Sequence, residues 1–585
     1  MPFSRPICRV NGFRGVIVRT LASLFAVAAG RVSAIDIPVD VLDDPVPNGC
    51  STGSCSLREA VTLANALSGP DRILLPATPG LPLQLSIPGS GENANATGDL
   101  NVLDDLEIVG TGVDTTILVQ TAQDRVLRTS MAVGKKLTLR GLTIEGGNSG
   151  AGGAVSSTSL LTIEDAALIG NHATFEGGAI HHGGSYAPQI TEPRLVLRRV
   201  TFRDNVVTQT SGTGQGGAIY ANSTFQGSPY LLVEDCVFDN NQAKSGGGAI
   251  LLNGSPSLFG GTAVIRRSTF SGNRSSDAGG AALSMPFTSF VLAVEDSVFE
   301  SNVSTSTSDY AGGAIDLGQV TSTKVVRTTF SGNSGRRGGA ISTYSPMQII
   351  DSHFLDNSAA VRGGAVSGGS NLLVERSTFE SNKVTTTDVT NDGGGAIAFA
   401  GDVLGVQRST FSDNDAYRGG AISLVQGVMQ LYGSTLVAPA FGIAGRAGTA
   451  LRIRDDTTAS LAIANTILAG SCQFPSSGRQ LAIAYNNIES AGSTCRLATA
   501  ALGAQNHSAA SSAELHLAAL ADNGGPTPTR MPLADSIAID QGRSNYCTAA
   551  DQRHFVGADA NCDIGAVEAG ATMDVLFSDG FDPGH

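Results

Sequence analysis

The sequence has no tryptophan, and charged residues make up only 15 % of its 585 positions. The net charge of −14 argues against a nucleic-acid partner, because binding a phosphate backbone requires a basic face. Beyond the N-terminal region no apolar run of about 18 residues occurs, so no transmembrane span is expected after signal removal. Glycine is abundant instead, at 73 residues, and the apolar 41 % of the chain falls at regular places. This composition favours a folded array of short strands and tight turns.

The N-terminus predicts export. The apolar run LASLFAVAAG follows a basic region that contains Arg5, Arg9, Arg14 and Arg19. The string VSA at Val32 to Ala34 fits a small-residue cleavage site, so residues 1–34 are expected to form a signal peptide. The alternative is an N-terminal membrane anchor, but the run is too short to span a bilayer. We therefore expect the mature protein to be secreted or at the cell surface, associated with the outer membrane, rather than in the periplasm.

Cysteine usage agrees with an oxidising compartment. Cys8 leaves with the signal, and six of the others form three local pairs outside the main repeat: Cys50 with Cys55, Cys472 with Cys495, and Cys547 with Cys562. These pairs are expected to be disulfides. Zinc is the alternative, but no pair has a CxxC spacing or a nearby histidine. The remaining Cys236 takes a place that serine or threonine usually holds in the repeat, which suits a small structural residue.

A phenylalanine-anchored string recurs through the middle of the chain, as in RSTFSDNDAYRGGAIS from Arg408. The anchors, spaced 24 to 36 residues apart, are Phe202, Phe238, Phe270, Phe299, Phe330, Phe354, Phe379 and Phe411, with Leu168 as an earlier one. A period of this size with variable insertions indicates a solenoid. Each unit has one β-rich piece after Gly-Gly-Ala and another leading into the phenylalanine. Such strands stack parallel with the matching strand of the next coil, which predicts an all-β fold, a parallel β-helix.

Each recurring residue has a structural interpretation. The phenylalanine points inward and stacks on the next, and its burial contributes about 1.5–3 kcal/mol. The asparagine three positions later is expected to turn the strand in a left-handed conformation and to stack its amide in a ladder. These residues are Asn171, Asn205, Asn241, Asn273, Asn302, Asn333, Asn357, Asn382 and Asn414. Paired glycines such as Gly363 and Gly364 permit a tight corner. A binding loop is the alternative, but recurrence in nearly every coil suits architecture better.

The residue three positions before each anchor alternates in charge. The series runs Asp165, Arg199, Asp235, Arg267, Asp296, Arg327, Asp351, Arg376, and then fails at Arg408. Matching positions of stacked coils lie about 4.8 Å apart, where opposite charges pair and like charges repel. We predict a charge ladder up one exterior face. Each exposed pair contributes about 0.2–1 kcal/mol, so the main effect of the ladder is on register.

The GGA-I/V and F-x-x-N motifs recur together from about Gly152 to Ile422. They resemble the repeats of the polymorphic outer-membrane protein family, whose passenger regions are right-handed parallel β-helices on bacterial surfaces. The resemblance implies a right-handed parallel β-helix, which we expect over residues 96–470.

The string CSLREAVTLANAL begins at Cys55. Its residues Leu57, Ala60, Val61 and Ala64 share one helical face, which predicts a short helix that caps the open edge of the first coil. The string resembles the signature of the CSLREA domain, found at the start of secreted bacterial β-helix proteins, and we assign residues 35–95 to this cap. A catalytic role for Arg58 and Glu59 is the alternative, but adjacent exposed charges on a helix are ordinary.

The C-terminal region resembles a choice-of-anchor Q module, over 522–542 and 551–568. It departs from that family's pattern at Ile537, where proline is usual, and at His554, where glycine is usual. We expect residues 471–570 to complete the β-helix and form this module. Four acidic residues of the region are candidate calcium ligands, with capping and turn chemistry as the alternative: Asp540, Asp551, Asp563 and Glu568. Residues 571–585 resemble the short F-x-D-G-F tail of some exported bacterial proteins, a sorting or anchoring signal.

No catalytic residue, metal ligand or cofactor is assigned from the sequence. A parallel β-helix also carries pectate lyases and related polysaccharide enzymes, so fold alone leaves function open. Such enzymes need calcium-binding carboxylates with a base, or two facing carboxylates. Candidate acids exist at Glu164, Glu234, Glu295 and the ladder aspartates, but the arginine partners already account for the latter. His181 and His182 are adjacent in a strand and face opposite ways, and no G-x-S-x-G elbow appears.

We therefore favour a non-catalytic protein. Ser/Thr-rich insertions within 204–217 and 381–395 are expected at the same corner of successive coils, where loops on a rigid scaffold present binding residues. An adhesion or matrix-binding role follows, with a surface glycan or a host or matrix protein as the unidentified partner. The alternative is a polysaccharide lyase or glycoside hydrolase on the same fold.

Overall fold

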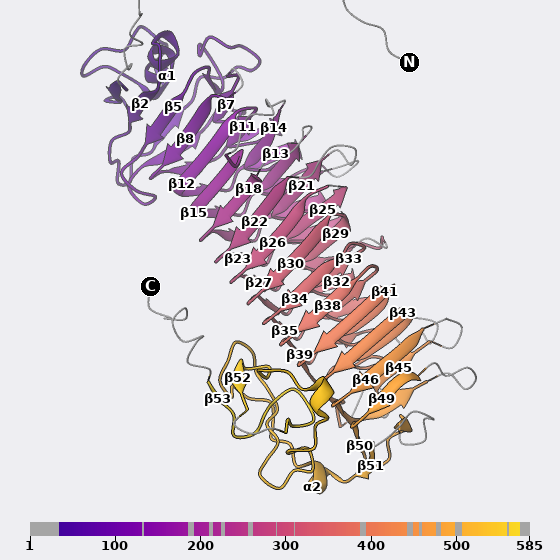
Figure 1. The fold of residues 1–585 in the computed structure, drawn as a ribbon. Helices are drawn as coiled ribbons and strands as arrows, with labels where there is room; N and C mark the ends of the chain where they lie inside the picture. The colour runs from indigo at the N-terminus through magenta and orange to yellow at the C-terminus, as the bar shows by residue number, and fades with distance from the viewer. Residues whose placement is uncertain are drawn as a thin grey trace, which may run out of the picture.

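The computed structural model is a right-handed parallel β-helix in which almost every strand pairs with the matching strand of the next coil. The structure describes residues 34–131, 134–184, 192–209, 214–223, 229–254, 261–287, 289–308, 311–386, 393–440, 449–454, 459–474, 481–497, 506–557 and 561–573. The coils form a rod with the N-terminal helix at one end and a C-terminal module packed beside the other (Figure 1). Among the described residues, no helix has the length and apolar character needed to cross a bilayer.

Four walls run along the rod. The GGA wall contains the strands that follow Gly-Gly-Ala and the strands that stack with them toward both ends of the rod: β4 (Leu100–Val102), β7 (Leu127–Thr129), β11 (Val155–Ser157), β14 (Ile180–Gly184), β17 (Ile219–Ser223), β21 (Ile250–Gly254), β25 (Leu283–Phe287), β29 (Ile315–Gln319), β33 (Ile341–Thr343), β37 (Val366–Gly368), the first parts of β41 (Ile397–Gln407) and β43 (Ile422–Tyr432), β45 (Thr449–Ile453) and β48 (Ser471–Gln473).

The charged wall contains the strands that end at the alternating charges and the strands that stack with them toward both ends of the rod. They are β1 (Asp36–Pro38), β2 (Asp71–Leu74), β5 (Leu106–Val109), β8 (Lys136–Arg140), the first parts of β12 (Leu160–Ile169) and β15 (Leu195–Arg203), β18 (Pro229–Glu234), β22 (Thr262–Arg266), β26 (Val291–Glu295), β30 (Ser322–Val326), β34 (Met347–Ile350), β38 (Leu372–Glu375), the second parts of β41 and β43, β46 (Ser460–Ala464) and β49 (Leu481–Tyr485).

The phenylalanine wall contains the strands that carry the anchors and the strands that stack with them toward both ends of the rod. They are β3 (Leu83–Leu85), β6 (Ile117–Gln120), β9 (Thr143–Glu145), the second parts of β12 and β15, β19 (Val237–Asp239), β23 (Thr269–Ser271), β27 (Val298–Glu300), β31 (Thr329–Ser331), β35 (His353–Leu355), β39 (Thr378–Glu380), β42 (Thr410–Ser412), β44 (Thr435–Val437), β47 (Ile467–Ala469), β50 (Ile488–Ser490) and β51 (His507–Ala510).

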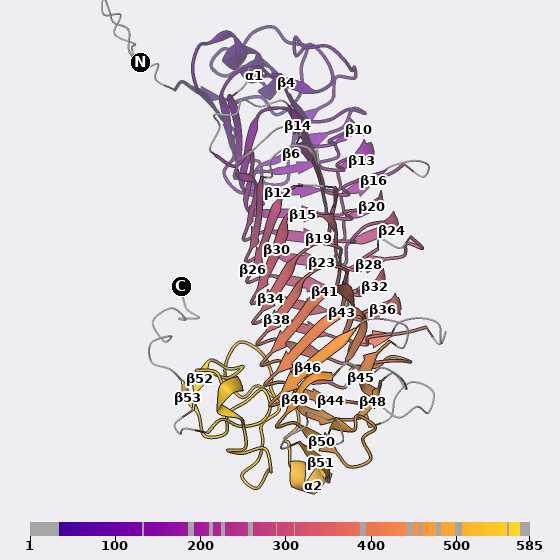
Figure 2. The same ribbon diagram turned by 45° about the vertical axis from the view of Figure 1, so that its right-hand side comes forward.

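The short wall is a separate nine-stranded sheet that lies along one side of the rod (Figure 2). Its strands are β10 (Asn148–Ala151), β13 (His172–Glu176), β16 (Val206–Val207), β20 (Gln242–Ser245), β24 (Arg274–Ala278), β28 (Val303–Ser304), β32 (Ser334–Arg337), β36 (Ser358–Arg362) and β40 (Lys383–Val384). Outside the four walls, α1 (Leu57–Ala66) covers the first coils, and the C-terminal module contains α2 (Ser512–Leu515), a 3-10 helix (Ser544–Tyr546), β52 (Phe555–Val556) and β53 (Thr572–Met573).

The anchor phenylalanines form one continuous stack inside the rod. Rings of successive coils, from Phe202 to Phe411, lie 4.6–4.9 Å apart between centroids and within 11° of parallel. All eight are fully buried. Leu168 pairs with Phe202 at the upper end and Leu436 pairs with Phe411 at the lower end. The stack is therefore continued by leucine in both directions, and it fixes which coil positions face the core.

The asparagine side chains form a second internal ladder. Asn241 is representative: its Nδ2 donates to Asn273 Oδ1 at 3.0 Å and to the Phe202 carbonyl of the preceding coil at 3.0 Å. One part of the sequence interpretation is wrong, because the ladder asparagines do not adopt the left-handed conformation. The residue immediately before each asparagine does, as at Asn240 with φ 53° and Ser301 with φ 55°. The asparagine itself stays extended because its amide must reach both neighbouring coils.

The Gly-Gly corners are required by close backbone contacts. Gly363 has φ 65°, and a Cβ on Gly364 would lie 2.0 Å from the Gly395 carbonyl oxygen. No side chain fits there without separating the coils. The same corner recurs along the GGA wall, so it belongs to the architecture.

Candidate functional site

The alternating charges lie on one exterior edge of the charged wall. Arg199 Nε lies 2.6 Å from Asp165 Oδ1, and Arg267 Nε lies 2.7 Å from Asp235 Oδ1. Arg327 Nε lies 2.5 Å from Asp296 Oδ1, and Arg376 Nε lies 2.9 Å from Asp351 Oδ1. All eight of these residues adopt a left-handed conformation, with φ between 46° and 54°. The turn that ends each charged strand thus places each arginine beside the aspartate of the coil before it.

A second charged column runs beside the first, and its alternation was not predicted from the sequence. Arg198 contacts Glu164 at 2.8 Å and Glu234 at 3.2 Å, and Arg266 contacts Glu234 at 2.8 Å. The strand register continues this column from Arg140 before it to Glu295 after it. From Glu164 to Asp296, each coil therefore carries two adjacent charges of the same sign, and the sign alternates from one coil to the next. A search for alternation at every position of the repeat, and not only before the anchor, would have found it.

These pairs keep the carboxylates ionised. The hydrogen bond from Arg199 lowers the pKa of Asp165, and the hydrogen bond from Arg267 lowers the pKa of Asp235. For Glu234, burial acts to raise the pKa, but the hydrogen bonds and charges of the surrounding arginines outweigh it and the pKa is lowered. A carboxylate held in this way is a poor general acid or base near neutral pH.

The alternation ends where the C-terminal module docks. His554 Nε2 lies 2.9 Å from Asp351 Oδ1, so this histidine joins the module to the ladder. Gln552 donates to Thr378 Oγ1 at 2.8 Å and accepts from Thr410 Oγ1 at 2.7 Å, which links two coils of the phenylalanine wall. Arg408 lies beneath the module. Burial lowers its pKa to about 10, although the carboxylates of Asp551 and Glu568 oppose that shift.

Three of the four carboxylates considered as calcium ligands, those of Asp551, Asp563 and Glu568, accept hydrogen bonds within the module. Both carboxylate oxygens of Asp551 accept hydrogen bonds, from the Arg553 and Phe555 amides and the Arg553 guanidinium among others. Asp563 Oδ1 accepts from the Asp540 amide at 2.8 Å, and Glu568 Oε1 accepts from the Asp563 amide at 2.8 Å. Within the described ranges, no group of three or more His, Cys, Asp or Glu side chains is placed to hold a metal ion.

The N-terminal helix α1 covers the first coils with the residues expected, since Leu57, Ala60, Val61 and Ala64 are buried. The interpretation of the adjacent charges as exposed is wrong. Arg58 is fully buried and forms a two-pronged pair with Asp44 at 2.7 and 2.8 Å. Glu59 is also buried and closes a capping box with Ser56. Arg58 therefore joins the helix to Asp44 and to the Gly98 carbonyl, and Glu59 stabilises the start of the helix. These partners replace the water that an exposed charge would bind.

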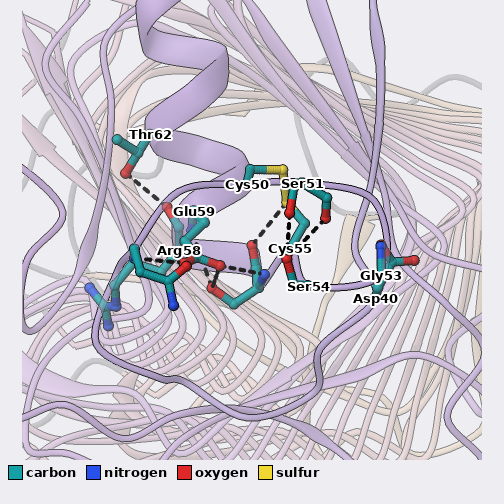
Figure 3. The surroundings of a disulfide bond; sticks show 11 residues. Asp40, Cys50, Ser51, Gly53, Ser54, Cys55, Arg58, Glu59 and Thr62 are labelled. Atoms are coloured by element: carbon teal, nitrogen blue, oxygen red, sulfur yellow. Dashed lines mark hydrogen bonds between the residues drawn. A yellow bond between two sulfur atoms is a disulfide. The ribbon is translucent and has the colours of Figure 1, made fainter.

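Three disulfides join the cysteine pairs expected from the sequence: Cys50–Cys55, Cys472–Cys495 and Cys547–Cys562. Figure 3 shows the first of them beside the start of α1, with the Gly53 amide donating to Asp40 at 2.7 Å. Cys236 is buried as a free thiol, and burial raises its pKa to about 12. It occupies a column that Ser268, Ser297 and Thr328 fill in the following coils, and its amide donates to Ser268 Oγ at 3.1 Å.

The adjacent histidines face opposite ways in β14. His181 stacks on Tyr220 of the next coil, with ring centroids 5.5 Å apart. His182 is fully buried, and burial lowers its pKa to about 3. A histidine that stays neutral at physiological pH suits the core better than proton transfer.

Several hollows lie on the exterior of the described residues, and two of them contain carboxylates away from the C-terminal module. A groove of about 910 Å³ crosses the first coils of the charged wall and is lined by paired charges such as Arg72, Glu107 and Arg140. A cleft of about 490 Å³ lies over β25 and β29 of the GGA wall. One of its lining residues is Asp316. Burial raises the pKa of the Asp316 carboxyl to about 7. Asp316 was not predicted from the sequence, because its position in the repeat varies between coils and holds Tyr220, Leu251 and Ser284 in the three coils before it.

Several sequence expectations lie outside the described residues. These are the signal peptide apart from Ala34, the last part of the C-terminal tail from residue 574, and the central parts of the two Ser/Thr-rich insertions, 210–213 and 387–392. The strands that flank those insertions, β16 and β40 before them and β17 and β41 after them, belong to the short wall and the GGA wall respectively. Both insertions therefore leave and re-enter the rod at the same corner.

Comparison with known proteins identifies the repeat. The family model described as the Chlamydia polymorphic membrane protein (Chlamydia_PMP) repeat matches residues 199–222, 235–253 and 327–344. Each matched segment contains a Gly-Gly-Ala corner and an anchor phenylalanine. The chain is thus a parallel β-helix with repeats of the polymorphic membrane protein type. No curated protein matches the sequence.

Two solved structures were also matched. The A-module of the Azotobacter vinelandii mannuronan C-5 epimerase AlgE6 aligns with a TM-score of 0.28 and 12 % identity, over 78 % of this chain and 96 % of that one. The AlgE4 A-module of the same organism aligns with a TM-score of 0.25 and 12 % identity, over the same shares of the two chains. Scores this low have no bearing on the function of this protein.

Proposed function

We propose that this protein is an exported, surface-exposed rod that binds a partner and does not catalyse a reaction. The observation that carries the proposal is the pairing of the wall carboxylates. Asp165, Asp235, Asp296 and Asp351 each contact an arginine of the next coil. Polysaccharide cleavage needs a carboxylate that can bind calcium, move a proton or attack. Carboxylates paired with guanidinium groups fix the register of the coils and are not available to bind calcium, transfer a proton or attack a substrate.

Three further features support the export and surface parts of the proposal. The matched repeats are described as those of a membrane protein. Three disulfides suit an oxidising compartment. The N-terminal sequence has the basic region, apolar run and small-residue site of a signal peptide. The rod then carries its insertions along one corner, where Ser/Thr-rich loops would contact a glycan or a matrix protein.

A carbohydrate-active enzyme is the second candidate, favoured by one observation. Asp316 has a pKa of about 7 in a cleft, which is where a general acid operates at neutral pH. A hydrolase of either stereochemistry would require a second carboxylate across the cleft. Asp316 is the only carboxylate among the described residues that line it.

The test incubates the purified protein, with calcium, with a panel of acidic and neutral polysaccharides. We expect no new reducing ends and no unsaturated products. Product formation that is lost in Asp316→Asn would overturn the proposal and assign an enzyme. Binding to cells or matrix is then compared between the protein and a variant in which residues 387–392 are replaced by glycine and serine. Unchanged binding would remove that insertion from the proposed surface.

A further inference from the structure

The cleft over the GGA wall combines features that the repeat does not require. It is lined by parts of β25 and β29, by Tyr344 just after β33, and by side chains from the neighbouring short wall. In the two strands the register pairs Ser284 with Asp316 and Phe287 with Gln319. Its volume, about 490 Å³, lies within the range of small-molecule sites.

Asp316 lies beneath this cleft. Its strand neighbours Ile315 and Leu317 point into the core, so strand alternation turns the Asp316 side chain toward the exterior. The residue is nonetheless only 3 % exposed. Its carboxyl accepts hydrogen bonds from the Ser342 side chain and the Gly312 amide. Oδ1 has no hydrogen-bond partner among the described residues, although leaving a buried polar atom unmatched costs about 1–3 kcal/mol.

Two aromatic side chains border the same cleft. Phe287 is 57 % exposed and Tyr344 is 36 % exposed, and both line the cleft. The anchor phenylalanines of this protein are fully buried, so an exposed phenylalanine is a departure from its own pattern. The other polar lining includes neutral side chains, among them Gln215, Gln319 and Ser284. Asp316 and the Tyr344 phenol are the only titratable groups among the described lining residues.

The chemistry of these groups selects a class of ligand. Burial raises the pKa of Asp316 to about 7, so both protonation states are present near neutrality. A hydroxyl group can accept from the protonated carboxyl and donate to the ionised one. An amine would satisfy only the ionised form, and an anion would be repelled by it. Exposed aromatic rings meanwhile offer flat apolar faces beside the amide groups.

We propose that this cleft binds a neutral saccharide, with a ring face on Phe287 or Tyr344 and a hydroxyl group as the missing partner of Asp316 Oδ1. The inference rests on the proposed binding function and names both a ligand class and a surface for it, which includes Gln215 at the end of the first Ser/Thr-rich insertion. A free oligosaccharide and the glycan of a glycoprotein present the same chemistry, so both belong to the test.

The test screens the purified protein on an array of neutral, acidic and amino oligosaccharides and glycoproteins, and measures the affinity of each ligand bound by titration calorimetry. Phe287→Ala, Tyr344→Ala and Asp316→Asn are the cleft variants. Phe175→Ala and Asp402→Asn are matched controls, because both residues are exposed and line no part of the cleft. Melting temperature establishes that each variant is folded, and Phe287→Ala keeps the test valid if Asp316→Asn does not fold.

We expect a neutral saccharide to bind at least tenfold more weakly to Phe287→Ala and to Asp316→Asn, and equally to the controls. Its affinity should change less than threefold between pH 5.5 and pH 8. Binding that is unaffected by the cleft variants would overturn this inference while the proposed binding function stands. Preference for amino oligosaccharides, with affinity rising with pH, would overturn the ligand class. Saccharide cleavage lost in Asp316→Asn would overturn the non-catalytic function while keeping the cleft as the saccharide site.

Discussion

Arg267 reaches back to Asp235 on the preceding coil, with Nε 2.7 Å from Oδ1 and Nη2 3.0 Å from Oδ2. Both residues sit in the left-handed region, with φ 47° and 54°. A side chain with a Cβ is disfavoured there by about 1 kcal/mol. Each ladder residue from Asp165 to Arg376 adopts this strained conformation. The turn that results aligns the aspartate and arginine side chains of successive coils for contact.

Charge reversal in the ladder should therefore destabilise more than charge removal. Asp235→Arg would set three arginines on successive coils, whereas Asp235→Asn removes the charge and still tolerates a positive φ. We expect Asp235→Arg to lower the free energy of unfolding by about 1 kcal/mol more than Asp235→Asn. Chemical denaturation at low salt measures the difference, and 1 M NaCl should reduce it. Equal stability of the two variants at low salt would contradict a role for the ladder in stability.

Truncation of one ring in the internal stack should be costly. Phe379 lies between Phe354 and Phe411, at 4.6 and 4.8 Å between ring centroids. Phe379→Ala removes a fully buried ring and leaves a cavity that the rigid coils cannot close, so we expect a loss of about 3–5 kcal/mol. Exposed Phe175 provides the control, and Phe175→Ala should change the denaturation midpoint little. A small effect at Phe379 would mean that the coils collapse locally.

The asparagine ladder is sensitive to a change of one atom. Asn333 Nδ2 donates to the Phe299 carbonyl and to Asn357 Oδ1, both at 2.9 Å. Asn333→Asp replaces that donor by an oxygen that faces two acceptors, and we expect a loss of about 3 kcal/mol or more at pH 7. Protonation of the new carboxyl restores one donor, so acid should recover part of the lost stability. Denaturation midpoints at pH 4 and pH 7, against those of the unchanged protein, measure this recovery.

Asp316 should make stability depend on pH in the direction opposite to the ladder acids. Its pKa is about 7 in the folded chain against about 3.9 in an unfolded one. The folded state therefore binds the proton more tightly, and stability falls as pH rises from about 4 to 7. Relative to Asp316→Asn, the unchanged protein should lose roughly 4 kcal/mol over that interval. Parallel stability profiles for the two proteins would show that the carboxyl is not desolvated.

Removal of the His554 imidazole should loosen the C-terminal module. His554 bonds to Asp351, whose pKa is lowered by this histidine and by Arg376 despite the opposing effect of burial. We expect His554→Ala to speed proteolysis within 522–557 at neutral pH while the coils stay intact. His516→Ala is the control, because His516 pairs with Asp535 at the exposed surface of the same module. Identical cleavage rates would show that the contacts of Gln552 with Thr378 and Thr410 suffice for docking.

The fold was largely predictable from the sequence, because each repeat contains the same residues at the positions that make the contacts between coils. Phenylalanine spacing predicts the internal stack, and the sign before each anchor predicts which side chains face one another across coils. The left-handed turn was misplaced by one residue, because asparagine and its small or polar predecessors both favour that conformation in isolation. Only the paired amides decide between them.

The candidate site was less predictable, because it depends on contacts between residues that do not recur in the repeat. Arg58 forms a hydrogen bond with Asp44, and His554 forms one with Asp351, which lies 203 positions earlier in the sequence. The burial of Arg58 and Asp316 follows from loops and coils that cover them, which local pattern does not encode. Departures from the repeat were the available signal: an aspartate at 316 between Ser284 and Ser342 of the neighbouring coils, and a phenylalanine at 287 that is not an anchor.

The double alternation of charge sets a rule for how this rod can change in length. Loss of one coil between Glu164 and Asp296 would bring two doubly anionic or two doubly cationic coils together. Loss or gain of two coils preserves every opposite-charge contact, apart from local differences in loop length. The natural unit of growth is therefore a pair of coils, one of each sign, and engineered rods of other lengths should be cut and joined in steps of two.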